Sequence, residues 1–137
     1  MKKLIAITGT LCLMLLTMTM TTRQGMTATQ EAEILGRVVV FVNEGCHYCQ
    51  AFDREIAKAY PKTDIGQHLP MVRVDTFDPP KEYAVLAKEM CFTPTILVLD
   101  SSGVERARFR GYRGNEFFWA DLEAVAAKLG FVAKHEH

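Results

Sequence analysis

Residues 43–56 read NEGCHYCQAFDREI and place two cysteines, Cys46 and Cys49, three positions apart. The run before them, RVVVFV at 37–42, is continuous, β-branched and aromatic, which predicts a strand buried on both faces of a sheet. From Cys49 onward the apolar residues recur at helical spacing, which predicts a helix that ends near Pro61. The cysteine pair is therefore expected at the junction between a buried strand and the first turn of a helix.

Free backbone N–H groups and the helix dipole favour negative charge at such a junction. We therefore expect Cys46, at or near the N-cap, to have a thiol pKa below its ordinary value and to act as the nucleophile. Cys49 lies one turn further in, where it is placed to attack a mixed disulfide formed at Cys46. The spacing thus predicts an exposed attacking thiol and a shielded resolving thiol for thiol–disulfide exchange.

Three other uses of the cysteine pair are less favoured. A zinc site needs about four ligands, and Cys91 and His47 are the only plausible additions. Covalent haem attachment is excluded because Gln50, not histidine, follows the second cysteine. A purely structural bridge would close a loop too small to constrain the unfolded chain much. No cofactor and no metal are expected.

A second motif precedes another buried strand, predicted at 93–100 from the run TPTILVLD. Proline is tolerated at the first residue of a strand, so Thr93 and Pro94 mark its beginning. One interpretation is an ordinary trans proline. The other is a cis-proline loop packed against Cys46 and Cys49. In that case the backbone of Thr93 pairs with an incoming peptide strand, and Pro94 keeps metals off the thiols.

The remaining pattern completes an α/β fold class. The other expected elements are helices at 31–36, 81–90 and 116–129, strands at 71–75 and 104–110, and a connector at 62–70. The order β-α-β-α-β-β-α predicts a central mixed sheet with helices on both faces. Strand–helix–strand units predict parallel pairing, and the closing hairpin adds an antiparallel edge.

The first 28 residues have a different character from the rest. Two lysines precede an uncharged apolar stretch, which is typical of a secretory signal peptide. Ala28 is the candidate residue before the cut, but bulky Met26 makes the cleavage site poor, so an uncleaved N-terminal anchor is the alternative. We expect residues 1–28 to be the signal peptide or anchor and residues 29–137 to form one domain.

Charge and cysteine content exclude several classes of function. The chain has 16 basic and 16 acidic residues, and because the leader removes three bases and no acid, the remainder is acidic. A nucleic-acid surface or a basic membrane patch is therefore not expected. Three cysteines remain outside the leader, which fits one pair and one free thiol rather than a disulfide framework. Four arginines are interpreted as a solvated strand face: Arg106, Arg108, Arg110 and Arg113.

Three residues near the motifs have two interpretations each. His47 is either a solvated histidine or, when protonated, a group that stabilises the Cys46 thiolate and makes the disulfide more oxidising. Tyr48 either covers the pair or contacts substrate. Cys91, three residues before Pro94, is by default a buried inert thiol; the alternative is a regulatory thiol that forms a mixed disulfide or a dimer.

Taken together, VVVFVNEGCHYC, FTPTILVLDSSG and the final helix resemble thioredoxin-fold proteins over residues 30–130. The resemblance implies a thioredoxin-like domain at 29–137. It also implies a redox-active disulfide between Cys46 and Cys49 and a cis peptide bond before Pro94.

A narrower resemblance involves GCHYC, FTPT and GYRGNEFFW, which look like the SoxS-type periplasmic thioredoxins of bacterial sulfur-oxidation systems. It implies a reductase that keeps thiols of the sulfur-carrier machinery reduced. Its electrons are implied to arrive through a membrane thiol–disulfide transporter.

The chain departs from general thioredoxins at positions that bear on the redox potential. Gly45 replaces the aromatic residue before the first cysteine, and His47-Tyr48 replaces Gly-Pro between the cysteines. Val40 stands where many thioredoxins have a buried acid, and Glu44 is a surface candidate to substitute for it.

These observations predict an exported, periplasmic thiol–disulfide oxidoreductase that acts as a reductase on a protein partner. An oxidase or isomerase is the alternative within the same class, and His47 favours it. A non-catalytic copper-binding or carrier module is the alternative of another class. Its only mid-chain candidate for a further ligand is His68, which lies in a connector.

Overall fold

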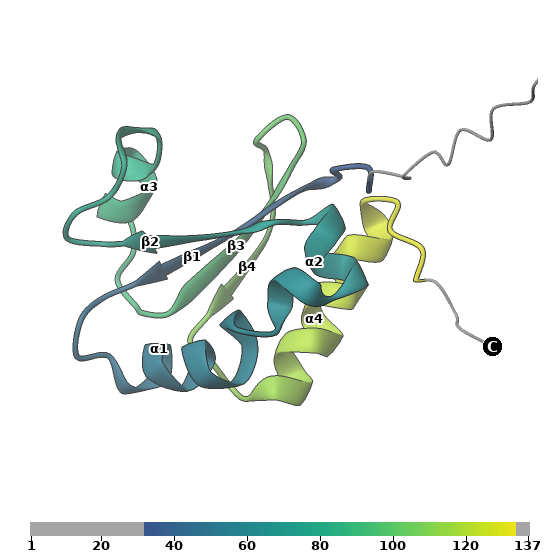
Figure 1. Ribbon diagram of the computed structural model, residues 1–137. Helices are drawn as coiled ribbons and strands as arrows, with labels where there is room; N and C mark the ends of the chain where they lie inside the picture. Colours follow the sequence, from purple (N-terminus) through teal and green to yellow (C-terminus); the bar gives the residue numbers. More distant parts are fainter. Residues whose placement is uncertain (1–31, 134–137) are drawn as a thin grey trace, which may run out of the picture. The chain divides into compact units, whose positions relative to one another are not determined.

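The computed structural model describes residues 32–133, which belong to one compact unit (Figure 1). The predicted signal peptide or anchor at 1–28, and the boundary that follows it, lie outside the described residues. Within 32–133 no helix has the length and apolar character needed to cross a membrane.

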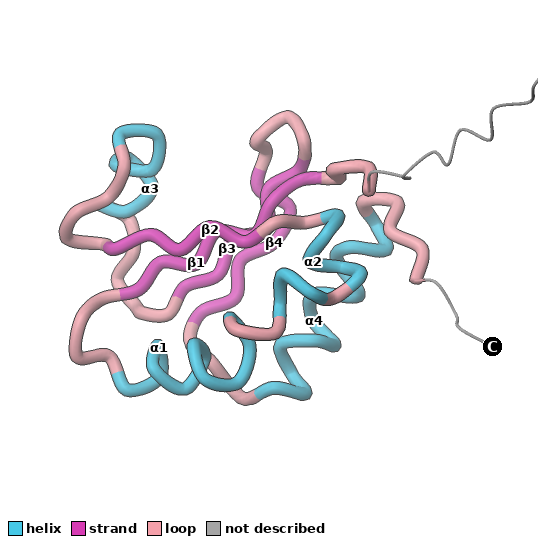
Figure 2. Tube along the Cα trace, in the orientation of Figure 1, coloured by secondary structure: helices cyan, strands magenta, loops and turns pink. Residues whose placement is uncertain are grey.

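Four strands form one mixed sheet (Figure 2). In sheet order they are β2 (Met71–Asp75), β1 (Gly36–Val42), β3 (Thr95–Asp100) and β4 (Glu105–Arg110). The central strand β1 pairs in parallel with β2 and antiparallel with β3, and β3 pairs antiparallel with β4. The α/β class and the mixed sheet predicted from the sequence are confirmed.

The direction of β3 differs from the sequence prediction. Strand–helix–strand order suggested that β3 runs parallel to β1, whereas Phe41 pairs with Thr95 and Gly36 with Asp100 in antiparallel register. The intervening α3 (Ala84–Lys88) has only five residues and lies at the end of the sheet where β2 ends (Figure 1). The chain therefore re-enters the sheet from that end, so β3 begins beside the end of β1.

Helices cover both faces of the sheet, as predicted (Figure 1). One face carries α1 (His47–Phe52), α2 (Asp64–His68) and α4 (Asn115–Lys128), and the other carries α3. A π-helical turn, η1 (Asp53–Ala57), continues α1. Two short 3-10 turns complete the helical segments, η2 (Tyr60–Lys62) and η3 (Lys81–Tyr83).

The alternation of side chains along β1 builds two cores. Val38, Val40 and Val42 face α1 and α4, whereas Val39 and Phe41 face α3. All five are 0–1% exposed, which confirms the prediction of a strand buried on both faces. Burying an apolar side chain of this size contributes roughly 1.5–3 kcal/mol to stability, so β1 is the central element of the fold.

Two local predictions are wrong. Residues 32–35 form no helix, because the N–H of Leu35 donates to the carbonyl of His68 (2.9 Å) and so fastens this segment alongside α2. The expected connector at 62–70 contains α2. That helix begins where the Thr63 hydroxyl accepts a hydrogen bond from the N–H of Gly66 (3.0 Å), as an N-cap residue does.

The turn between β3 and β4 is built on the Asp100 carboxylate. It accepts hydrogen bonds from the N–H groups of Val104 and Ser102 (both 2.9 Å) and from Arg106 Nε (2.7 Å). The hydrogen bond from Val104, helped by those from Arg106 and Ser102, holds the pKa of Asp100 below its ordinary value of 3.8.

A group with a lowered pKa in the folded state stabilises the fold above its unfolded-state pKa and loses that contribution as the pH falls through the folded value. We therefore expect Asp100→Asn to lower the midpoint of urea unfolding at neutral pH. The difference from the wild type should shrink as the pH falls below the unfolded-state pKa of Asp100 and through its lower folded-state pKa. Urea titrations at neutral pH and at a series of acidic pH values check this, and a difference that does not change with pH would contradict it.

Candidate active site

A tight turn leads from β1 to the cysteine pair. Gly45, directly before Cys46, has φ = 78°, a left-handed conformation that strains other L-residues. A Cβ atom at Gly45 would meet no atom within 4 Å, so backbone conformation rather than lack of space favours glycine here. Glycine thus stands, in a conformation that suits it, where the general thioredoxin pattern has an aromatic residue.

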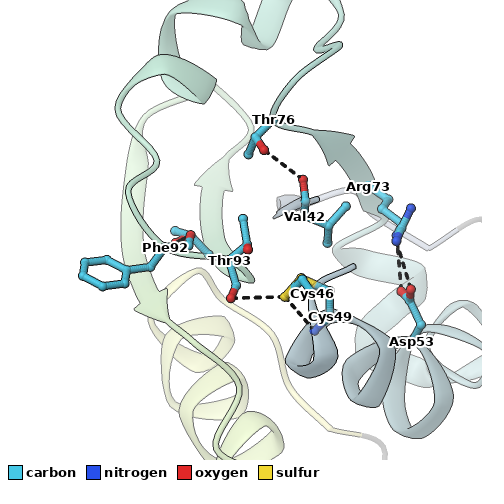
Figure 3. The surroundings of a disulfide bond; sticks show 9 residues. Val42, Cys46, Cys49, Asp53, Arg73, Thr76, Phe92 and Thr93 are labelled. Carbon is cyan, nitrogen blue, oxygen red and sulfur yellow. Dashed lines mark hydrogen bonds and ion pairs between the residues drawn. A yellow bond between two sulfur atoms is a disulfide. The ribbon is translucent and has the colours of Figure 1, made fainter. Parts of the chain in front are cut away.

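Cys46 is the N-cap of α1, as the sequence predicted. Its Sγ accepts a hydrogen bond from the N–H of Cys49 (3.2 Å), and the two cysteines form a disulfide with Cα atoms 5.2 Å apart (Figure 3). Cys46 is half-buried, whereas Cys49 is 1% exposed. The arrangement leaves the first sulfur accessible and shields the second.

The segment before β3 lies against the disulfide. The carbonyl oxygen of Thr93 is 3.4 Å from Cys46 Sγ (Figure 3), and the peptide bond between Thr93 and Pro94 is cis. The Thr95 hydroxyl donates to the carbonyl of Phe92 (2.6 Å) and secures the bend. The Thr93 side chain is half-buried.

The surroundings of Cys49 are apolar. Val40, at the position of the expected buried acid, is fully buried in the same side-chain cluster as Cys49 and Phe52. Burial among apolar groups favours the neutral thiol over the thiolate. Glu44, the candidate substitute, lies exposed on the turn before Cys46. The two sulfurs therefore differ in their surroundings as well as in exposure.

His47 and Tyr48 form part of the surface beside the pair. Both side chains are exposed, Tyr48 to 61%, and their rings meet edge to face with centroids 5.9 Å apart. They occupy the first turn of α1, directly after Cys46.

The default prediction that Cys91 is buried is wrong, because its thiol is exposed. Cys91 lies in the loop between α3 and β3, where Met90 packs against the core on the α3 side and the next residues turn outward. Phe92 is 64% exposed, and its ring points away from the disulfide (Figure 3). The Cys91 sulfur lies 3.8 Å from the carbonyl of Glu89.

Among residues 32–133 no group of three or more His, Cys, Asp or Glu side chains is arranged to hold a metal ion. His68, the candidate further ligand, is instead engaged at the end of α2. Its Nδ1 lies 2.7 Å from the carbonyl oxygen of Glu33, and its Nε2 lies 3.9 Å from the Asp64 carboxylate.

Two contacts that were not predicted from the sequence hold the turn after α1. Arg73 on β2 binds the Asp53 carboxylate through two nitrogens (3.0 and 3.3 Å; Figure 3). The Tyr112 hydroxyl donates to Glu55 (2.6 Å) across 57 positions of the sequence. The only sequence signal was the loop GYRG, whose two glycines flank Tyr112.

The architecture and the position of the pair can be compared with known proteins. Residues 25–126 match the family model of the thioredoxin-like domain. The chain belongs to the thioredoxin-like family. No match was found among curated proteins.

Several solved structures resemble this thioredoxin-like protein. The periplasmic thioredoxin SoxS from Paracoccus pantotrophus, in its reduced form, is 36% identical, with a TM-score of 0.58 over 67% of this chain and 96% of that one. A thioredoxin-fold protein from Helicobacter pylori (19%, TM-score 0.56, 77% and 81% covered) shares the fold. So does a thioredoxin from Thermus thermophilus (22%, TM-score 0.54, 75% and 85% covered).

Family membership and the disulfide between Cys46 and Cys49 together define the chemistry of this protein. It is a thiol–disulfide oxidoreductase of the thioredoxin type. The pair carries two electrons and two protons when it passes from disulfide to dithiol.

The position of Cys46 leads to a measurable expectation for the reduced protein. In a Cys91→Ser background, the rate of alkylation by iodoacetamide should rise with pH along a curve centred below about 8.5, the ordinary pKa of a cysteine. The reason is stabilisation of the Cys46 thiolate by the helix N-terminus and the N–H of Cys49.

A Cys46→Ser, Cys91→Ser variant is the matched control, because its only cysteine in the described part of the chain is the buried Cys49. This variant should react slowly throughout the pH range. A curve for Cys46 centred at the ordinary value would show that the helix does not activate this thiol.

Proposed function

We propose that this protein is an exported, periplasmic reductase that keeps cysteines of a partner protein reduced. One observation carries the proposal. Cys46 is half-exposed at the N-terminus of α1, its Sγ accepts the N–H of Cys49, and the carbonyl of Thr93 lies 3.4 Å away. An accessible sulfur beside an open backbone segment suits the attack on a disulfide held by an extended polypeptide.

The reaction begins with the dithiol form. The Cys46 thiolate attacks one sulfur of the partner disulfide, a mixed disulfide forms, and the partner's other sulfur leaves as a thiolate that takes up a proton. Cys49 then loses its proton and attacks Cys46 Sγ. The Cys46–Cys49 disulfide forms and the second partner thiol is released, so two electrons have passed to the partner.

Burial of Cys49 supports this division of roles. A shielded thiol in apolar surroundings does not compete for external disulfides, yet it lies one helical turn from Cys46, where it attacks the mixed disulfide intramolecularly. Thr93 and Pro94 form the substrate-binding edge in this proposal, and the exposed His47 and Tyr48 follow Cys46 in the first turn of α1.

The place and partners of the reaction are supported by two further observations. The lysines and the uncharged apolar stretch of residues 1–28 have the pattern of an export signal, and the 36% identical SoxS is a periplasmic thioredoxin. A periplasmic reductase must receive electrons from the cytoplasmic side, so we propose a membrane thiol–disulfide transporter as donor. We propose protein thiols of sulfur-oxidation carrier machinery as the substrate.

Trapping tests the mechanism directly. Cys49→Ser removes the resolving thiol, so the mixed disulfide at Cys46 should accumulate when the reduced variant is mixed with periplasmic extract. Non-reducing electrophoresis detects the complex, and mass spectrometry of the released partner identifies it.

The matched control for trapping is Cys46→Ser, which should capture nothing and should lose insulin-disulfide reduction down to the uncatalysed background. The proposal fails if Cys49→Ser accumulates no complex in extract, or if Cys46→Ser retains the activity.

The direction of electron flow is tested by the redox potential. A reductase should equilibrate with glutathione or dithiothreitol buffers near the thioredoxin value of about −270 mV, whereas an oxidant lies near about −120 mV. We expect a value close to the first. A value near the second would instead favour the oxidase alternative, in which protonated His47 stabilises the Cys46 thiolate.

A further inference from the structure

The loop between β4 and α4, residues 111–114, connects the two halves of the active site. We infer that Tyr112 is a positioning residue for disulfide exchange. Through its hydrogen bond to Glu55 it holds the cysteine-bearing helix against the segment of Thr93 and Pro94. The inference rests on the proposed roles of Cys46 and Thr93, and it adds a residue that neither motif contains.

Tyr112 meets the helical segment after the cysteines at two points. Its ring packs edge to face against Phe52, with centroids 5.5 Å apart, and its hydroxyl donates to Glu55 Oε2 at 2.6 Å. Phe52 lies in α1 and Glu55 in η1, so the contacts span the join between them. The tyrosine is only 8% exposed, whereas Glu55 is exposed, so the hydrogen bond between them is part-buried.

The other end of the same loop is fastened to the substrate-binding edge. The N–H of Gly111 donates to the carbonyl of Pro94 at 2.7 Å. Gly111 and Gly114 have φ values of 78° and 114°, conformations that glycine adopts readily. They allow the chain to leave β4, present Tyr112 inward and enter α4. Pro94 and Glu55 are thus connected through two consecutive loop residues.

These contacts form a closed ring of interactions around the reacting sulfur. From Pro94 it passes through Gly111 and Tyr112 to Glu55, back along the helix to Cys46, and across 3.4 Å to the carbonyl of Thr93. The hydrogen bond from Tyr112 to Glu55 completes this ring. It therefore fixes the distance between Cys46 on one side of the site and Thr93 on the other.

The helical turn that carries Glu55 is irregular. Residues 53–57 form a π-helical turn, which replaces the regular α-helical hydrogen bonds and is common at functional sites. Ile56 of this turn is buried in the core, and two polar side-chain contacts also hold the turn. Arg73 holds Asp53 from β2, and Tyr112 holds Glu55 from the loop. Of the two, the Tyr112 contact is the one that leads to the segment of Pro94.

The phenol is suited to a permanent donor role. Burial, and secondly the hydrogen bond to Glu55, raise the pKa of Tyr112 well above its ordinary value of 10. Tyr112 is therefore protonated, and able to donate, at every pH at which thiol exchange is measured.

Tyr112→Phe is the test, because it removes the hydroxyl and keeps the ring against Phe52. We expect kcat/KM for reduction of insulin to fall roughly five- to tenfold, since orientation of the reacting groups dominates such steps. Alkylation of Cys46 by iodoacetamide, which needs no alignment with Thr93, should keep its wild-type rate and pH profile. Arg73→Met is the matched control: it frees the same turn on its other side and should leave insulin reduction within about twofold of wild type.

Variants of Glu55 separate positioning from general stability. Glu55→Gln keeps a side-chain oxygen that accepts from Tyr112 and should retain near wild-type activity, whereas Glu55→Leu should match Tyr112→Phe. The double variant Tyr112→Phe, Glu55→Leu should be no slower than either single variant, since both remove one interaction. Glu55 is exposed, so its replacement by leucine should not prevent folding. Glu55→Leu therefore tests the inference if Tyr112→Phe does not fold.

Three results would overturn the inference. One is unchanged insulin reduction in both Tyr112→Phe and Glu55→Leu. Another is an equal loss in insulin reduction and in Cys46 alkylation, which would mean that the thiol itself has changed. The third is an equal loss in Arg73→Met, which would reduce the effect to general loosening of the turn. A wild-type protein that fails to reduce insulin would instead refute the proposed function, so the two failures are distinguishable.

Discussion

The antiparallel pairing of β1 with β3 is the constraint on which the rest of this site depends. Phe41 lies opposite Thr95, so the residues that precede β3 meet the residues that follow β1. Thr93 is thereby placed against Cys46 without any direct sequence relation between the two motifs. If β3 ran parallel to β1, the segment before β3 would lie at the other end of the strands, far from the cysteines.

Within that frame, the environments of the two sulfurs differ because α1 begins at the surface and runs inward over β1. Cys46 caps the helix, where backbone N–H groups face it, and Cys49 lies one turn later among Val40 and Phe52. Polarity and access favour reaction at the first sulfur, and apolar burial protects the second. A valine in place of an acid leaves the buried thiol without a carboxylate partner in that cluster.

The site is also assembled from a third segment, which lies far along the chain. The loop after β4 contacts Pro94 through Gly111 and the turn after α1 through Tyr112. A thioredoxin-like protein with this loop has a connection between the nucleophile's helix and the proline segment that does not pass through the disulfide.

Local pattern alone predicted the four strands, the helices after Cys46 and after Gly114, and the junction that holds Cys46 and Cys49, but it missed α2 and wrongly placed a helix before β1. Each of the correctly predicted elements is encoded by neighbouring residues, through side-chain periodicity, helix capping and proline's restrictions. The direction of β3, the exposure of Cys91 and the bond from Tyr112 to Glu55 appeared only in the tertiary structure. The first two depend on where the chain returns to the sheet after the short helix α3. The third is a contact between residues far apart in the sequence, and such contacts produce no periodic pattern in a single sequence.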